Sequence, residues 1–462
     1  MTIQDPDPAP DLGSAPDLGS GPGSGSAPDL GSGPGSGSGP GSGFGPGSGS
    51  GPGPDFGAGS GPGFGPGSGP DAGPDFDPDE AGSVQESLEM YARLRGSGPV
   101  ARSGGYGGFW ALTRHADVAA AAADPVTFIS SVRAVVPSDP RGLRRPPLNY
   151  DAPAHTPYRR ALDRTLQRAR IARLEPRLRE HAARELTPLV ERGGGDVAQE
   201  FGARFPAWVT TEWLNLDPEL APELAGTAAR WVRAWRALDR EVVDETSERM
   251  YGIARDLVRD RRERPRPVAE DPASSLLAER PDGRPLAEEH IVGALRQCLV
   301  VGLVAPPILL GSICVHLSRH RELQSELRAR PELLPAALEE LLRLYAPYRG
   351  FARTVSKEIE LHGRRIAPGE PVTLVYASAN RDEAVFPDPD TFVMGRPNIA
   401  AHLAFGRGRH ACAGMPLARL SMRIALEELL RRTSAIEVSG PVESARMPEL
   451  GAVSVPLRLR PA

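Results

Sequence analysis

Apolar residues recur at intervals of three and four along most of the chain after residue 82, the pattern of amphipathic helices. The longest such segment, Glu288–Arg319, is apolar on most sides and predicts a buried helix. A second, His155–Leu186, predicts a helix that breaks near Pro176, because proline lacks the amide hydrogen that the helix needs. The other predicted helices are Ser83–Arg95, Ala116–Ala123, Val197–Leu214, Glu219–Val258, Arg321–Arg328, Leu334–Leu344 and a last one from Cys412 to about Arg432.

Strand patterns are short and few. They are predicted at Gly108–Thr113, Ile359–Leu361, Arg364–Ile366 and Val372–Val375, with further short strands at the C-terminus. The sequence therefore predicts a mainly α fold with small β-sheets, formed as one domain over residues 83–462.

The segment Cys298–Leu317 contains no Asp, Glu, Lys or Arg and is long enough to cross a bilayer. Gly302, Gly311 and the Pro306–Pro307 pair interrupt it, and no belt of aromatic residues flanks it. A core helix of a large protein explains it as well. We therefore expect no membrane association.

The first 82 residues differ from the rest in composition. They hold half of the 52 glycines, and Ala-Pro-Asp-Leu-Gly-Ser occurs three times before Gly-Pro-Gly-Ser units take over. Because this segment has few apolar residues, their burial cannot offset the entropy lost on folding. Residues 1–82 are therefore predicted to be a disordered acidic tail. A passive linker and a tether for a partner are the two interpretations of this segment.

Charge and cysteine content exclude several classes of protein. Residues 1–82 carry eleven acids and no Lys or Arg, which leaves 48 acids against 54 bases in the remainder. No basic block with interleaved aromatics suggests nucleic-acid binding. Three cysteines do not make a disulfide framework, so a cytoplasmic location is expected. Lys357 is the only lysine, a bias that we attribute to high-GC coding, as in actinobacteria.

The strongest chemical motif is the stretch from Phe405 to Gly414, Phe-Gly-Arg-Gly-Arg-His-Ala-Cys-Ala-Gly. Its glycines permit tight turns and the close approach of a bulky flat ligand. Cys412 stands just before an amphipathic helix, whose amides favour a thiolate. Such a thiolate suits an iron ligand. A buried structural cysteine and a nucleophile assisted by His410 are the alternatives.

This stretch resembles the haem-binding loop of the cytochrome P450 family, F-G-x-G-x-H-x-C-x-G, with every fixed position filled. The resemblance implies the P450 fold, a triangular helical body with small sheets, and haem b as cofactor. It implies Cys412 as the axial iron ligand, with Phe405 packed under the sulfur. Gly406 then lies against the haem, and His410 is expected to bind a propionate.

Other family motifs follow in the expected order, and together they cover residues 83–462. Arg353 resembles the propionate-binding arginine in the strand after the helix that carries Glu340, and the segment His155–Arg159 resembles an H-x-x-x-R motif whose His and Arg contact a propionate. The expected structural triad comprises Glu340, Arg343 and Arg396.

The apolar segment departs from the family pattern where it would cross the distal haem face. The family has a small residue, Gly, any residue, an acid and Thr, and the acid and alcohol deliver protons. Here Gly302 is retained, but Val304 stands in the acid position and Ala305 in the Thr position. Pro306 and the proline after it leave the carbonyls of Gly302 and Leu303 without helical donors, which predicts a kink.

Three functions remain open at this point. The first is a monooxygenase that uses O2 and external electron donors, a ferredoxin with its reductase, and takes protons from water or substrate. The second is a P450 that needs no acid–alcohol pair: a peroxide-driven enzyme, an oxidative coupling enzyme, or an isomerase or dehydratase. The third is a non-catalytic haem-binding protein. The expected substrate is a small organic molecule or natural-product intermediate.

The resemblance places the substrate pocket among Ser130–Tyr150, Trp208–Trp235, Val301–Pro307 and Tyr348–Phe351. Val301, Arg349 and Phe351 are the candidate substrate residues. If Arg349 enters the pocket, its guanidinium could bind a substrate carboxylate in a bidentate manner. The candidate basic surface for a ferredoxin consists of Arg160, Arg164, Arg407 and Arg409.

Overall fold

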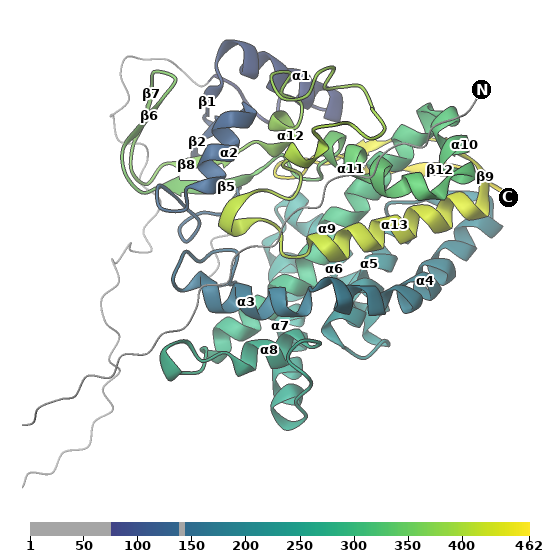
Figure 1. Ribbon diagram of the computed structural model, residues 1–462, viewed down its shortest axis with the longest axis horizontal. Helices are drawn as coiled ribbons and strands as arrows, with labels where there is room; N and C mark the ends of the chain where they lie inside the picture. The colour runs from purple at the N-terminus through teal and green to yellow at the C-terminus, as the bar shows by residue number, and fades with distance from the viewer. Residues whose placement is uncertain (1–74, 138–143) are drawn as a thin grey trace, which may run out of the picture. The chain divides into compact units, whose positions relative to one another are not determined.

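The computed structural model describes residues 75–137 and 144–462, and in this part of the chain α-helices predominate (Figure 1). The α-helices are α1 (Val84–Ser97), α2 (His115–Ala123), α3 (His155–Thr165), α4 (Arg168–Glu191), α5 (Phe201–Leu214), α6 (Leu220–Ala237), α7 (Arg240–Glu263), α8 (Pro272–Ala278), α9 (Glu288–Arg319), α10 (Arg321–Ala329), α11 (Leu334–Leu344), α12 (Tyr376–Ala379) and α13 (Met415–Arg432). The strands are β1 (Val100–Ser103), β2 (Phe109–Leu112), β3 (Phe128–Ile129), β4 (Gly194–Asp196), β5 (Phe351–Val355), β6 (Ile359–Leu361), β7 (Arg364–Ile366), β8 (Pro371–Leu374), β9 (Thr433–Val438), β10 (Glu443–Ser444), β11 (Ala452–Ser454) and β12 (Pro456–Pro461).

Helix α9 is the core helix of the domain. It packs against α5, α6, α7 and α8, and towards its C-terminal end against β9 and β11. Among the described residues it is the one helix long and apolar enough to cross a membrane, yet 67% of its most apolar window is buried inside the protein. Its apolar faces are thus covered by other helices, as expected for a buried helix.

The main sheet has the order β1-β2-β8-β5-β3, in which β2 and β8 are parallel and the other neighbours are antiparallel. Helix α12 follows β8 directly and packs against α1 and α2. A second sheet, β4-β12-β9, joins the C-terminal strand to the loop after α4. The main sheet matters for the site because it carries Arg353 on β5 beside β8.

The predicted break near Pro176 is wrong. The chain breaks instead between α3 and α4, where Gln167 is extended (ψ 144°), and Pro176 lies inside α4. Pro176 and Ala172 are exposed, so water can satisfy the Ala172 carbonyl that the proline leaves without a donor. The predicted long helix Glu219–Val258 is also interrupted, because Leu238 takes a left-handed conformation (φ 58°) and Asp239 caps α7.

The last residues of the predicted tail pack against the domain. The Asp75 amide donates to the Arg102 carbonyl (2.8 Å), and the Phe76 ring meets Phe109 edge-on with centroids 5.9 Å apart. Asp75 and Phe76 thus contact the domain although they precede residue 82, and the boundary at residue 82 stays a prediction. The remainder of the predicted tail, residues 1–74, lies outside the described residues.

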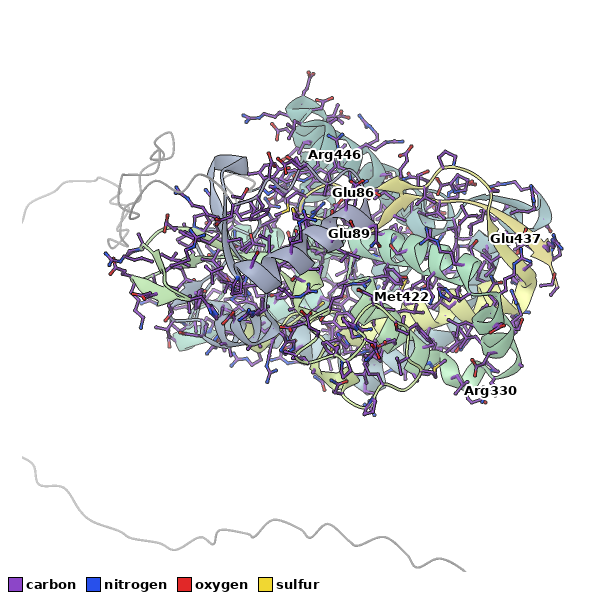
Figure 2. All side chains as sticks on the ribbon, turned by 90° about the horizontal axis from the view of Figure 1, so that it is seen from above. Glu86, Glu89, Arg330, Met422, Glu437 and Arg446 are labelled. Carbon is purple, nitrogen blue, oxygen red and sulfur yellow. The ribbon has the colours of Figure 1, made fainter. Side chains whose placement is uncertain are left out.

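One ionic cluster is fully enclosed, whereas most charged side chains lie at the surface, as Arg330 does in Figure 2. The Glu340 carboxylate accepts hydrogen bonds from Arg343 (2.7 and 2.9 Å), from Arg396 (3.0 Å) and from the Val393 amide (3.1 Å). Burial alone would raise the pKa of Glu340, but the two arginines hold it below its ordinary value. The cluster ties α11 to the segment that leads to the cysteine loop.

Replacing Glu340 with alanine should reduce the free energy of unfolding by about 3–5 kcal/mol, because two buried guanidinium groups lose their counter-ion. Denaturant unfolding measures the change. The matched control is Glu245→Ala, which breaks the exposed Arg230–Glu245 pair and should change stability by about 0–1 kcal/mol. Equal losses in the two variants would contradict the role assigned to the cluster.

Candidate functional site

Cys412 lies in a loop that the backbone fixes just before α13. Its amide donates to the Phe405 carbonyl (2.8 Å), which closes the loop on itself. Burial raises the pKa of the thiol, while the amides of Gly414 and Met415 lower it. The amides thus favour the thiolate as predicted, but burial raises the pKa by more than they lower it. A positively charged metal ion at the sulfur would stabilise the thiolate.

Two glycines let this loop approach its neighbours closely. Gly408 has φ +72°, and a Cβ atom there would lie 2.2 Å from the Ala122 carbonyl oxygen. Gly406 has φ +67°, and its Cβ would meet the Tyr376 hydroxyl at 3.3 Å. Both conformations are unfavourable for residues with a side chain, so the glycine pattern of the motif has a structural reason.

The predicted propionate residues from three different elements lie together. The rings of His155 and His410 meet edge-on with centroids 4.7 Å apart. Burial and then the charge on His410 lower the pKa of His155 to about 4. Burial lowers the pKa of His410, and the charge on Arg353 lowers it further. Burial raises the pKa of Tyr376, and the same arginine lowers it. Arg353, His155 and His410 therefore face one region.

Arg159 and Phe405 support the cysteine loop. Arg159 donates to the carbonyls of Ala411 (2.6 Å) and Arg409 (3.2 Å) and pairs with Asp163. These contacts hold the loop, and direct binding of a propionate by Arg159 stays a prediction. The Phe405 ring is covered by the Arg419 guanidinium, 5.0 Å from the ring centroid.

Part of α9 is open among the residues that the structure describes. Val301 is 47% exposed although α9 is the core helix, and Ala305, one turn later, is partly exposed. Val304, the residue in the acid position, is 5% exposed and therefore more covered than either. The helix continues through Pro306 and Pro307 as one element, and the predicted kink stays a prediction.

The hydroxyl groups of Ser312 and Thr210 are the ones to consider near the Gly302–Pro307 part of α9. The Ser312 hydroxyl donates to the Ile308 carbonyl (2.8 Å) and accepts from the Ala452 amide (3.0 Å), so it is committed to structure. Thr210 of α5 lies against Gly302, because a Cβ atom on Gly302 would be 2.8 Å from its Oγ1. Sequence reasoning missed Thr210, since it considered hydroxyl groups only within the helix itself.

The candidate substrate residue Arg349 does not point into the pocket. Its guanidinium donates to the Glu449 carbonyl (3.2 Å) and to the Tyr91 hydroxyl (3.4 Å), and the residue is 2% exposed. Tyr348, one position earlier, forms a bridge with Glu449 and is partly exposed. Neighbours in an extended segment project to opposite faces, so the Tyr348 side chain points away from the side that Arg349 takes.

Phe351 remains on the pocket side. Its ring lies 5.1 Å from that of Tyr348 and 6.4 Å from that of Tyr376, by centroids. Phe351, Tyr348 and Val301 are partly exposed although they belong to interior elements, as expected for residues that line a pocket.

The predicted basic surface is only partly free of acidic partners. Arg160 and Arg164 both bind Glu279, and Glu279 has a pKa below its ordinary value because these arginines outweigh its burial. Arg407 and Arg409 are exposed, and no acidic side chain among residues 75–137 and 144–462 pairs with them.

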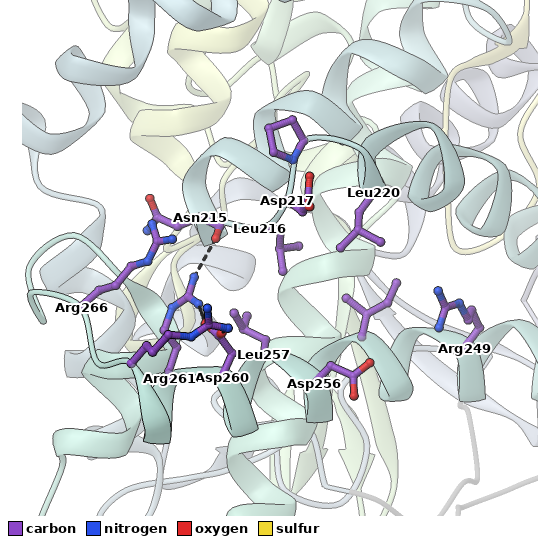
Figure 3. Close-up of a pocket in the computed structure, with 13 residues that line it drawn as sticks. Asn215, Leu216, Asp217, Leu220, Arg249, Asp256, Leu257, Asp260, Arg261 and Arg266 are labelled. Carbon is purple, nitrogen blue, oxygen red and sulfur yellow. Dashed lines mark hydrogen bonds and ion pairs between the residues drawn. The ribbon is translucent and has the colours of Figure 1, made fainter.

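A separate polar pocket lies between the α5–α6 turn and α7 (Figure 3). Arg261 donates to the Asn215 carbonyl (2.7 Å) and pairs with Asp260 and Asp271, and Arg249 pairs with Glu223. These charges pair with one another. The lining includes Asn215–Pro218 and Leu220 from the predicted pocket segment Trp208–Trp235, but none of the site residues that were predicted individually.

The donors at the cysteine site fit a haem. Both ring nitrogens of His155 and Nε2 of His410 are buried without a hydrogen-bond partner among the described residues, and Nε2 of His410 lies 3.8 Å from Oδ1 of Asp151. Buried polar atoms without partners are rare and call for a ligand. Carboxylates such as haem propionates match these donors and Arg353, and Cys412 supplies the thiolate that haem iron takes.

Comparisons with known proteins agree with this geometry. The family "Cytochrome P450" matches residues 313–457. Linalool 8-monooxygenase from Pseudomonas putida is 32% identical over 374 residues, covering 76% of this chain and 89% of that protein. Mycinamicin IV hydroxylase/epoxidase from Micromonospora griseorubida is 32% identical, covering 80% and 94%. The structure of cytochrome P450 CYP109Q5 from Chondromyces apiculatus has TM-score 0.74 at 29% identity, covering 82% and 96%.

These findings confirm the predicted fold class, the haem cofactor and the assignment as an oxidoreductase. The family match spans Glu340, Arg343, Arg353, Arg396 and the cysteine loop, and it begins after the unusual part of α9. The chain therefore belongs to the cytochrome P450 family of haem–thiolate enzymes.

Proposed function

We propose that the protein is a cytoplasmic monooxygenase that takes electrons from a ferredoxin and its reductase and oxidises a small, largely apolar natural-product intermediate. The observation that carries the proposal is the convergence of Cys412, Arg353, His155 and His410, donors and a thiolate from separate elements, on one haem-binding region. The printed activities of the relatives, monooxygenase and hydroxylase/epoxidase, support the reaction class.

The residues of this chain would act as follows. Cys412 would bind the iron from the loop that also carries Phe405 and Gly406, and Arg353, His155 and His410 would bind the propionates. When bound, haem supplies the oxidation chemistry. Val301, Ala305 and Phe351 exclude bulk water and offer apolar contact to substrate. Because α9 has no acid–alcohol pair, protons come from water held by the Gly302 and Leu303 carbonyls or by the Thr210 hydroxyl, or from the substrate.

The docking surface for the electron donor would centre on Arg407 and Arg409. Both are exposed beside the cysteine loop, and Arg409 borders a surface groove with Arg159 and Arg160. An acidic ferredoxin complements such a surface, and the attraction should weaken as salt is raised.

A second candidate function is a peroxide-driven or non-oxygenating P450 reaction. The specific observation in its favour is Val304–Ala305 in place of the proton-delivering pair. Such reactions do not need the two proton transfers that reduction of O2 requires.

Replacing Cys412 with serine should abolish the red-shifted Soret band of the reduced carbon monoxide complex, because a hydroxyl group cannot supply the thiolate. Absorption spectroscopy of purified protein measures this. The control is Cys314→Ala, a change at a buried cysteine of α9, which should leave the band unchanged. A retained band in the Cys412 variant would contradict the assignment of the ligand.

Replacing Arg353 with leucine should speed haem loss about 10- to 100-fold, since a charge-assisted hydrogen bond contributes about 1.5–3 kcal/mol. Transfer of haem to excess apomyoglobin gives the rate. Arg365→Leu, at an exposed position on β7, should leave the rate unchanged. If the two variants lose haem equally slowly, Arg353 does not bind a propionate.

With a substrate that shifts the Soret band, product should form with NAD(P)H, ferredoxin, reductase and O2 when catalase is present. Product analysis by mass spectrometry checks this, and a reaction without reductase is the control. Turnover by peroxide alone, with none from the reductase system, would instead support the second candidate function.

A further inference from the structure

We propose that Glu449 determines substrate specificity: its carboxylate, held by Arg236, accepts a hydrogen bond from a hydroxyl group on an otherwise apolar substrate. The inference rests on the proposed function, because it takes the region between Tyr348 and Cys412 as the place where substrate lies. It adds a polar contact to a pocket whose other lining residues are mostly apolar.

The backbone puts Glu449 on the pocket side. Glu449 lies between β10 and β11 and forms an antiparallel bridge with Tyr348. Directly opposed residues of an antiparallel pair project to the same face, so the two side chains share one face. Arg349 projects to the other face, towards Tyr91. The pairing therefore brings an acid from the C-terminal segment to the phenol that packs against Phe351.

The electrostatics of Tyr348 agree with this position. Burial raises the pKa of Tyr348, and the charge on Glu449 raises it further, while Arg236 lowers it and Cys412 raises it. Ring contacts lead from Tyr348 towards the cysteine loop: Phe351 lies 5.1 Å from Tyr348 and 6.4 Å from Tyr376 by centroids, and Tyr376 lies against Gly406.

Arg236 fixes one oxygen of the carboxylate and leaves the other available. Oε2 of Glu449 accepts from Nη2 (2.6 Å) and from Nε (2.9 Å) of Arg236, which belongs to α6. Among the described residues no group donates to Oε1. The Glu449 side chain is 5% exposed. Burial raises the pKa of Glu449 and Arg236 lowers it. An ionised carboxylate accepts about four hydrogen bonds, so Oε1 has capacity for a donor from a ligand.

The charges on Glu449 and Arg236 determine which kind of substrate group can donate a hydrogen bond to Glu449. Glu449 and Arg236 form a neutral pair, so a substrate ammonium group would leave one buried positive charge uncompensated. A hydroxyl group adds a hydrogen bond without adding charge. The Tyr348 hydroxyl group, on the same face, can donate to the oxygen of that substrate hydroxyl. Val301 and Phe351 supply the apolar contacts, so the expected ligand is an apolar molecule that carries an alcohol.

The test uses the haem-loaded protein and three probes with one carbon skeleton: a monoterpene alcohol, its methyl ether and the parent hydrocarbon. Titration of the Soret shift gives a Kd for each probe. The alcohol should bind about 10- to 100-fold more tightly than the ether, the range of a hydrogen bond to a charged group. In Glu449→Gln and Glu449→Asp this preference should fall at least about 10-fold, because the first removes the charge and the second withdraws the oxygen.

The control is Glu245→Gln, which removes the exposed partner of Arg230 on the same helix α6 and should keep the full preference. If the wild type has a thiolate-type spectrum but binds alcohol and ether equally, the inference about Glu449 is wrong and the proposed function stands. The same follows if the preference for the alcohol survives in both Glu449 variants. A wild-type protein that shows no thiolate-type haem spectrum overturns the proposed function and this inference with it.

Discussion

The structure around the haem region depends on one buried carboxylate. Glu340 binds Arg343 on its own helix and Arg396 from a distant segment, and Arg343 also donates to the carbonyls of Asn380 and Pro389. Ion pairs this deep are stable only when every donor is satisfied. The cluster thus fixes the chain between β8 and the cysteine loop, and this position holds the loop of Cys412, which precedes α13, against α3.

The fold class was predictable because it depends on local patterns. The helix over Glu288–Arg319 and that over Leu334–Leu344 follow from hydrophobic spacing, and the glycines of the cysteine loop follow from backbone geometry. The break after Leu166 was not predictable, because Pro176 carries the stronger local signal and its exposure to water became evident only in the structure. Local rules thus identified elements better than their interruptions.

The pocket was predicted less well, because its residues meet through long-range pairing. Arg349 was chosen for its charge, but the alternation of an extended segment turns it towards Tyr91 and leaves Tyr348 on the inner face. Glu449 lies about a hundred residues further along and gives no motif of its own, and only its bridge with Tyr348 reveals its place. The pocket side of α9 lacks an acid and an alcohol, but Glu449 and Tyr348 bring such groups from other segments.

The central claim is that this chain uses its thiolate-bound haem to insert oxygen from O2 although α9 carries Val304 and Ala305. The most direct measurement is turnover under isotopically labelled O2 with ferredoxin, reductase and NAD(P)H, followed by mass spectrometry of the product. The account predicts that one labelled oxygen atom appears in each product molecule. Substrate conversion with no label in the product would contradict it and would indicate an isomerase, a dehydratase or a coupling reaction.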